Sequence, residues 1–143
     1  MNTESALKHA EFNRGDVPLK IFQIWIQPNE LGAKPSYATR QFPGNDRSAL
    51  LTVLASGFKE DASNDPLPLR ANARLLASRI EADKSLSYNI EDGHQLYLVP
   101  SVGSLLVNGV QAEEGDGVAI YDKSVLEFKA LTDVQLVIVD LLS

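Results

Sequence analysis

The sequence predicts an all-β protein. Short apolar or alternating segments, separated by turn signals, make up most of the 143 residues, and helical periodicity is scarce. Such a pattern is typical of a sandwich or a barrel. Residues that favour positive φ or Asx turns punctuate the chain at 43–46, 64–66, 91–93, 108–109 and 115–117.

Ten segments have the composition or the alternation of a β-strand. In order they are 19–27, 37–42, 49–56, 74–80, 85–90, 95–99, 104–107, 118–121, 125–130 and 134–140. The segment 125–130 alternates apolar and charged residues, which predicts a sheet with one face exposed to water. Residues 59–68 are predicted to form a long surface loop, and the first sixteen or so residues an arm without strand alternation.

The segment 19–27 differs from the other strands because both of its faces are apolar. Its even positions carry Phe22, Ile24 and Ile26, and its odd positions carry Leu19, Ile21 and Trp25. A strand of this kind needs cover on both sides. As the only tryptophan, Trp25 is expected either in the core or at an interface.

Charge and cysteine content exclude several classes of function. A net charge of −6 argues against nucleic-acid binding. The absence of cysteine excludes disulfides and thiolate chemistry and suits a reducing cytoplasm. The longest apolar stretch, 134–142, is interrupted by Gln135 and Asp140, so neither membrane insertion nor export is indicated.

Several spaced motifs resemble the pirin family of two-cupin proteins. They are His9-Ala10-Glu11-Phe12-Asn13, Gln23-Ile24-Trp25-Ile26-Gln27-Pro28 and Pro35-Ser36-Tyr37, followed by the pattern from 107–109 to 115–117. The resemblance implies a cupin-type double-stranded β-helix, a jelly-roll barrel. It assigns residues 1–47 to an arm and remnant strands of a first cupin, and residues 48–143 to a C-terminal cupin barrel.

The same resemblance bears on metal binding. Pirins hold a metal, usually iron, with a His-x-His pair and a later His-x-Glu pair, and His9 and Glu11 match the second pair. The first pair would fall before residue 1, so only half of the ligand set carries over. Iron or manganese needs about three or four protein ligands, and a site completed where two arms meet in a dimer is the alternative to an inherited remnant.

The C-terminal barrel lacks the usual cupin ligands. Ile90, Asp92 and Leu96 occupy the positions of the two histidines and the glutamate, and 124–126 offers no final histidine. His94, two residues from a ligand position, is predicted to lie at the surface or at the start of a strand. This barrel is therefore expected to be structural, as the resemblance also implies.

These observations favour a non-catalytic association module that forms a homodimer through the strand around Phe22, Ile24 and Trp25. On this reading no cofactor is bound and the protein partner is unidentified. The alternative is an iron- or manganese-dependent dioxygenase of the quercetin-oxidising kind that uses His9 and Glu11. A third interpretation is a truncated reading frame that lost its function together with its N-terminal half.

Overall fold

The structure is a computed structural model that describes residues 10–30, 32, 34, 36–42 and 50–142. Within these residues the chain forms ten strands and one short 3-10 helix. In order they are β1 (Thr52–Ser56), η1 (Lys59–Asn64), β2 (Leu67–Pro68), β3 (Ala73–Ile80), β4 (Ser85–Asn89), β5 (His94–Val102), β6 (Leu105–Val107), β7 (Val110–Ala112), β8 (Val118–Ile120), β9 (Val125–Ala130) and β10 (Val134–Leu142).

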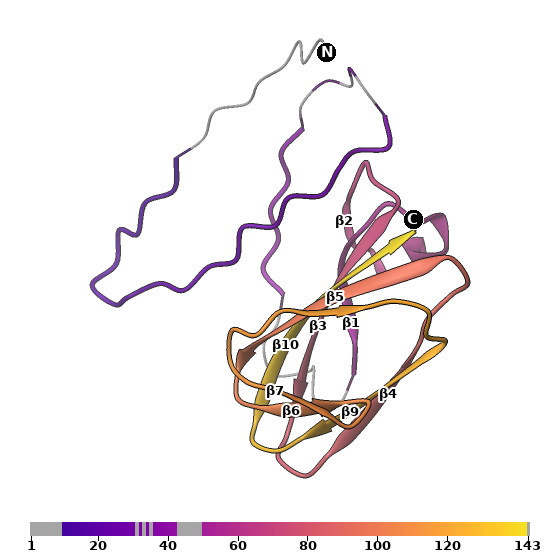
Figure 1. Ribbon diagram of the computed structural model, residues 1–143. Helices are drawn as coiled ribbons and strands as arrows, with labels where there is room; N and C mark the ends of the chain where they lie inside the picture. Colours follow the sequence, from indigo (N-terminus) through magenta and orange to yellow (C-terminus); the bar gives the residue numbers. More distant parts are fainter. Residues whose placement is uncertain (1–9, 31, 33, 35, 43–49, 143) are drawn as a thin grey trace.

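The strands form two sheets that close into a barrel (Figure 1). The larger sheet has the order β2-β1-β3-β10-β5-β8, and the smaller has the order β4-β9-β6-β7. β10 lies at the centre of the larger sheet and is antiparallel to both β3 and β5. This architecture confirms the predicted all-β cupin fold.

Alternation along each strand places the core between the sheets. In β9 the residues alternate strictly between exposed and buried, so Leu126 and Phe128 are buried as the sequence predicts. Even-numbered positions of β3, β5 and β10 face the same core. Its fully buried side chains include Ile80, Leu98, Leu105, Leu126, Phe128, Leu136 and Ile138.

The β6–β7 hairpin shows how a turn sets strand register. Asn108 and Gly109 form a two-residue loop in which both have positive φ, 47° and 82°, as a type I′ turn requires. Asn108 also connects the turn to β9, because its side-chain oxygen accepts a 2.8 Å hydrogen bond from the backbone N–H of Glu127 in that strand. The turn predicted at 108–109 is therefore confirmed, although the strand that follows it, β7, was not among the predicted strands.

Several sequence-based boundaries are wrong. Among the described residues, 19–27 and 37–42 form no strand, because neither segment lies in either of the two sheets. Residues 59–68 are not a plain loop but contain η1 and β2. β7 was not predicted, and β5 is longer than expected at both ends. The first strand begins at Thr52, and the predicted start at Ala49 lies outside the described residues.

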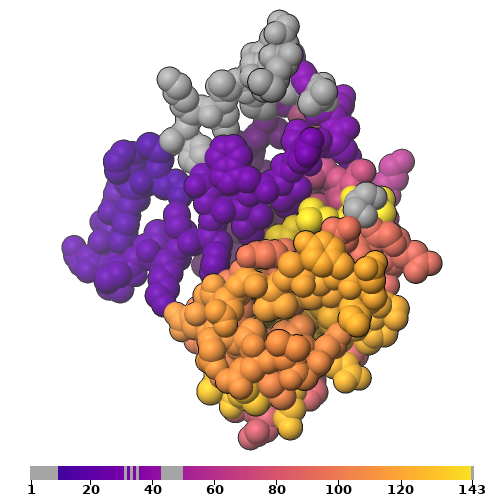
Figure 2. Space-filling model, in the orientation of Figure 1, coloured from indigo at the N-terminus to yellow at the C-terminus, as the bar shows by residue number. Residues whose placement is uncertain are grey.

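The described residues that precede β1 form an extended segment beside the barrel (Figures 1 and 2). Polar contacts join it to the barrel surface: the Lys20 Nζ lies 2.7 Å from Glu114, and the Asn29 backbone N–H donates to the Arg70 carbonyl at 3.0 Å. In the described part of the chain no helix is long and apolar enough to cross a membrane.

Candidate functional site

One end of the barrel interior is polar. Ser56, Arg74 and Asp140 are register partners across β1, β3 and β10. Arg74 is in phase with the core residue Leu76, and Asp140 is in phase with the core residue Ile138, so both side chains project inward. Both are buried. Two charged groups therefore lie where the strand pattern otherwise places apolar side chains.

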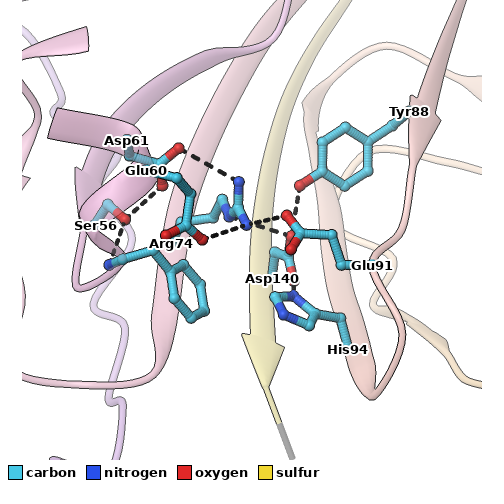
Figure 3. Close-up of polar contacts among 9 residues, drawn as sticks. Ser56, Glu60, Asp61, Arg74, Tyr88, Glu91, His94 and Asp140 are labelled. Atoms are coloured by element: carbon cyan, nitrogen blue, oxygen red, sulfur yellow. Dashed lines mark hydrogen bonds and ion pairs between the residues drawn. The ribbon is translucent and has the colours of Figure 1, made fainter. Parts of the chain in front are cut away.

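The guanidinium of Arg74 is the centre of this polar cluster (Figure 3). Its Nη2 lies 2.7 Å from Glu91, its Nη1 lies 3.3 Å from Asp61, and its Nε lies 3.4 Å from Asp140. Glu60 approaches to 3.7 Å. Arg74 thus connects β3 to η1, to β10 and to the loop that precedes β5.

An aromatic ring and a hydroxyl hold the η1 side of the cluster. The Arg74 guanidinium carbon lies 4.7 Å from the centre of the Phe58 ring, a cation–π arrangement. The Ser56 hydroxyl donates to Asp61 at 2.6 Å and accepts the Phe58 backbone N–H at 3.0 Å. These contacts explain why η1 packs against the barrel instead of forming a free loop.

Asp140 organises the opposite side of the cluster. One carboxylate oxygen lies 2.6 Å from His94 Nδ1, and the other accepts the Tyr88 hydroxyl at 2.5 Å. The imidazole packs against the Phe58 ring with centroids 5.3 Å apart. His94 starts β5, which is one of the two positions predicted for it, and its side chain is buried and not at the surface.

The buried environment shifts two ionisable groups. Burial alone would lower the pKa of Arg74, but the hydrogen bond to Glu91 and the nearby Tyr88, Asp61 and Asp140 raise it above its usual value. Burial raises the pKa of the Tyr88 hydroxyl, and the hydrogen bond to Asp140 and the charge of that carboxylate raise it further. Arg74 stays charged and Tyr88 stays neutral at physiological pH.

A cavity of about 390 Å³ opens beside the cluster, and Glu91 and His94 form part of its wall. The rest of the wall comes from the start of β5 and from the loops before β5 and β9: Gln95, Asp92, Gly93, Asp122, Lys123 and Ser124. The cavity is polar, and the neighbouring carboxylates of Asp61 and Asp140 contact Arg74 and His94. The cluster can hold the end of the barrel together by charge-assisted hydrogen bonds.

The predicted ligand positions of the C-terminal barrel do not fit a metal. Ile90 and Leu96 are buried core residues, and Asp92 lies on the cavity wall. In the described ranges no group of three or more His, Asp or Glu side chains is arranged to hold a metal ion. The inward charges described at this end of the barrel are the guanidinium of Arg74 and the carboxylate of Asp140.

The structure describes only one of the two candidate metal ligands of the arm. His9 lies outside the described residues, and Glu11 lies in an exposed, extended stretch of chain. Their proposed half-site stays a prediction. The buried positions of Arg74 and Asp140 were not predicted from the sequence. Each is a charged residue in phase with inward-facing apolar residues of its strand, and this pattern indicates a buried charge.

The segment 19–27 presents apolar side chains to solvent. Trp25 is 84% exposed and Leu19 is 63% exposed, whereas Ile24 on the opposite face is 40% exposed. A groove of about 630 Å³ lies between this segment and the barrel, with Ile21 and Phe22 on one wall and Val102 and Val137 on the other. Side chains from both faces of the segment line this groove. Among the large apolar residues, Phe22 and Ile24 are less exposed than Leu19, Ile21 and Trp25.

The two-sheet barrel and its inward-facing core define a protein of the cupin class. A family model described as the quercetinase C-terminal cupin domain matches residues 53–141, and the chain belongs to this pirin family. A pirin-like protein from Caulobacter vibrioides is 41% identical over 140 residues, which is 98% of this chain and 60% of that protein. A quercetin 2,3-dioxygenase from Escherichia coli K12 is 26% identical over 99% of this chain and 59% of its own length.

The solved structures agree with the sequence relatives. The crystal structure of YhhW from Escherichia coli superimposes with a TM-score of 0.74 at 26% identity, covering 82% of this chain and 47% of that one. The chain thus spans 60% or less of the length of the relatives named here. These findings confirm the resemblance inferred from the motifs.

Proposed function

We propose that this pirin-like cupin acts as an association module, in which the barrel is a scaffold and the apolar segment 19–27 binds a second copy of the chain. The observation that carries the proposal is the exposure of large apolar side chains close together in sequence. They are Phe12, Val17, Leu19, Ile21, Phe22, Ile24 and Trp25, each at least 40% exposed. Exposed apolar groups concentrated in one place are typical of interaction sites.

Energetics support an interface at this segment. Each Å² of apolar surface removed from water contributes about 25 cal/mol, and tryptophan is enriched among residues that dominate binding. A second copy presents the same apolar surface, so an isologous dimer covers both segments at once. The barrel end supports the scaffold role, because the ion pairs of Arg74 with Asp61 and Asp140 occupy its interior.

Light scattering and tryptophan fluorescence test the proposal together. We expect a dimer at micromolar concentration. Because Trp25 is the only tryptophan, its emission should shift to longer wavelength as dilution returns the indole to water. The double variant Phe22→Ser, Trp25→Ser should be a monomer with an unchanged far-ultraviolet circular dichroism spectrum, since neither residue lies in the barrel core.

A matched control separates this surface from general loss of apolar area. Val110 and Tyr121 are 67% and 57% exposed on the barrel itself, and the variant Val110→Ser, Tyr121→Ser should dimerise like the parent. A monomeric parent protein contradicts the proposal. So does stoichiometric iron or manganese that is lost in His9→Ala, which would favour the dioxygenase that the names of several relatives suggest.

A further inference from the structure

The turn between β6 and β7 contains an asparagine that is followed by glycine. Among the asparagines of the sequence, only Asn108 precedes a glycine, Gly109. Glycine has no side chain next to its backbone nitrogen, so this nitrogen meets little steric hindrance as it approaches the preceding side chain. An Asn-Gly pair is therefore the place where the backbone attacks an asparagine side-chain amide most readily.

The turn is also open to water. Asn108 and Gly109 are both exposed. A Cβ atom placed on Gly109 would have no atom beyond its chain neighbours within 4 Å. The nucleophilic nitrogen, the amide that it attacks and the water needed for hydrolysis are thus all available at one turn.

Hydrogen bonds to β9 hold the side-chain amide of Asn108 in place. Its Oδ1 accepts the backbone N–H of Glu127 at 2.8 Å, and its Nδ2 donates to the Val125 carbonyl at 3.3 Å. The Asn108 backbone N–H also donates to the Glu127 carbonyl at 2.9 Å. Before the amide carbon can bond to the Gly109 nitrogen, the side chain must rotate and leave both of its partners.

We infer that Asn108 is a site of deamidation and that its hydrogen bonds to β9 slow the reaction while the barrel is folded. The inference goes beyond the proposed association and does not depend on it. In the reaction the Gly109 nitrogen loses its proton and bonds to Cγ of Asn108, and Nδ2 leaves as ammonia, which carries that proton away. Water then opens the cyclic imide to give aspartate or isoaspartate, so no oxidant or reductant is consumed.

The product cannot restore both side-chain hydrogen bonds. An aspartate at position 108 accepts the Glu127 N–H but has no N–H to donate to the Val125 carbonyl. Isoaspartate also carries the backbone through the former side chain, which lengthens the two-residue loop that sets the register of the hairpin. Each deamidation therefore leaves a permanent chemical record that the contact between this turn and β9 has opened.

Peptide mass spectrometry measures the reaction with an internal control. Trypsin should release residues 85–123 as one peptide, because no lysine or arginine lies between Lys84 and Lys123. The same peptide contains Asn89, which precedes a bulky isoleucine, so fragment ions compare two asparagines in one sample. In urea above the unfolding transition, Asn108 should deamidate well before Asn89.

The same protein in buffer, at the same pH and temperature, reports the effect of the fold. Two hydrogen bonds of ordinary strength shift an opening equilibrium by roughly a factor of ten to a hundred. We therefore expect Asn108 to deamidate more slowly in buffer than in urea by about that factor. Equal rates in the two conditions, or a faster reaction in the folded protein, would overturn the inference.

The variant Gly109→Ala tests the identity of the attacking nitrogen, and it does so in urea, where its ability to fold is irrelevant. The added methyl group hinders the approach of the residue 109 nitrogen to Cγ of Asn108, so the unfolded variant should lose this amide severalfold more slowly than the unfolded parent. Equal rates, or a reaction at Asn89 before Asn108 in the parent, would overturn the site assignment. Neither result bears on the oligomeric state, which light scattering measures separately.

Discussion

At the scale of single residues, Arg74 is the cation that neutralises the buried end of the barrel. Its side chain is 9% exposed, while those of Asp61 and Asp140 are 7% and 1% exposed. A buried charge is costly unless it is paired. The cupin fold of this chain therefore depends on an ion-pair cluster at a place where apolar residues fill the rest of the interior.

Replacing Arg74 with methionine should destabilise the protein strongly. The variant keeps the aliphatic volume but leaves Asp61 and Asp140 without their cation, and removing one partner from a buried pair typically costs about 3–5 kcal/mol. Urea denaturation followed by circular dichroism measures this difference. Arg79→Met, at the exposed position of the same strand, is the control, and it should change the free energy of unfolding by less than about 0.5 kcal/mol. Equal effects of the two variants would contradict the assigned role.

Tyr88 makes the stability depend on pH in the alkaline range. Its pKa is raised in the folded protein by burial and by the hydrogen bond to Asp140, whereas a tyrosine in the unfolded chain has a pKa of about 10. The unfolded state therefore loses this proton first. The contribution of Tyr88 to the free energy of unfolding is fully present below about pH 10 and is lost as the pH rises toward its folded-state value.

The variant Tyr88→Phe isolates this effect. We expect the difference in free energy of unfolding between parent and variant to be constant between about pH 7 and pH 9 and to shrink above about pH 10. Urea denaturation at several pH values measures it, and ultraviolet absorbance shows whether one tyrosine of the four ionises late. A difference independent of pH would show that the Tyr88 hydroxyl ionises equally easily in both states.

At the scale of elements, local pattern predicted the strands of the barrel but not their partners. The strands that became β3, β4, β9 and β10 were predicted closely because alternation or continuous apolar character reflects burial within the chain itself. The segment 19–27 has the same local character, yet in the described part of the chain it belongs to neither sheet, because strand formation also requires a neighbouring strand to complete the ladder. Composition indicates that a ladder is favourable but does not identify the other strand.

The short elements were not predicted from the sequence for a different reason. η1 and β2 lie in a proline- and aspartate-rich stretch that has no periodicity, and β7 has only three residues. η1 is held by contacts that local periodicity does not reveal, since Asp61 is hydrogen-bonded to Ser56 of β1 and to Arg74 of β3. The polar cluster was not predicted for the same reason: Arg74 and Asp140 are far apart in sequence and become neighbours only when β3 pairs with β10.

At the scale of the whole molecule, the barrel and the segment 19–27 differ in how far their apolar side chains are removed from water. The barrel buries its apolar side chains within one chain, and its stability is therefore independent of protein concentration. The segment leaves Trp25 and Phe22 exposed by 84% and 51%. If a second copy covers them, part of the stability of the folded state comes from mass action.

The thermal unfolding midpoint should therefore rise with protein concentration. At a concentration about a hundredfold above the dissociation constant, binding adds about 2.7 kcal/mol to the folded state, and each kcal/mol raises the midpoint by about 2–4 °C in a domain of this size. Calorimetry over a hundredfold range of concentration measures the shift. The variant Phe22→Ser, Trp25→Ser should unfold at one temperature throughout, close to that of the parent at the lowest concentration, because its barrel core is unchanged. A midpoint independent of concentration in the parent would show that the apolar surface of residues 19–27 is not covered by a second copy.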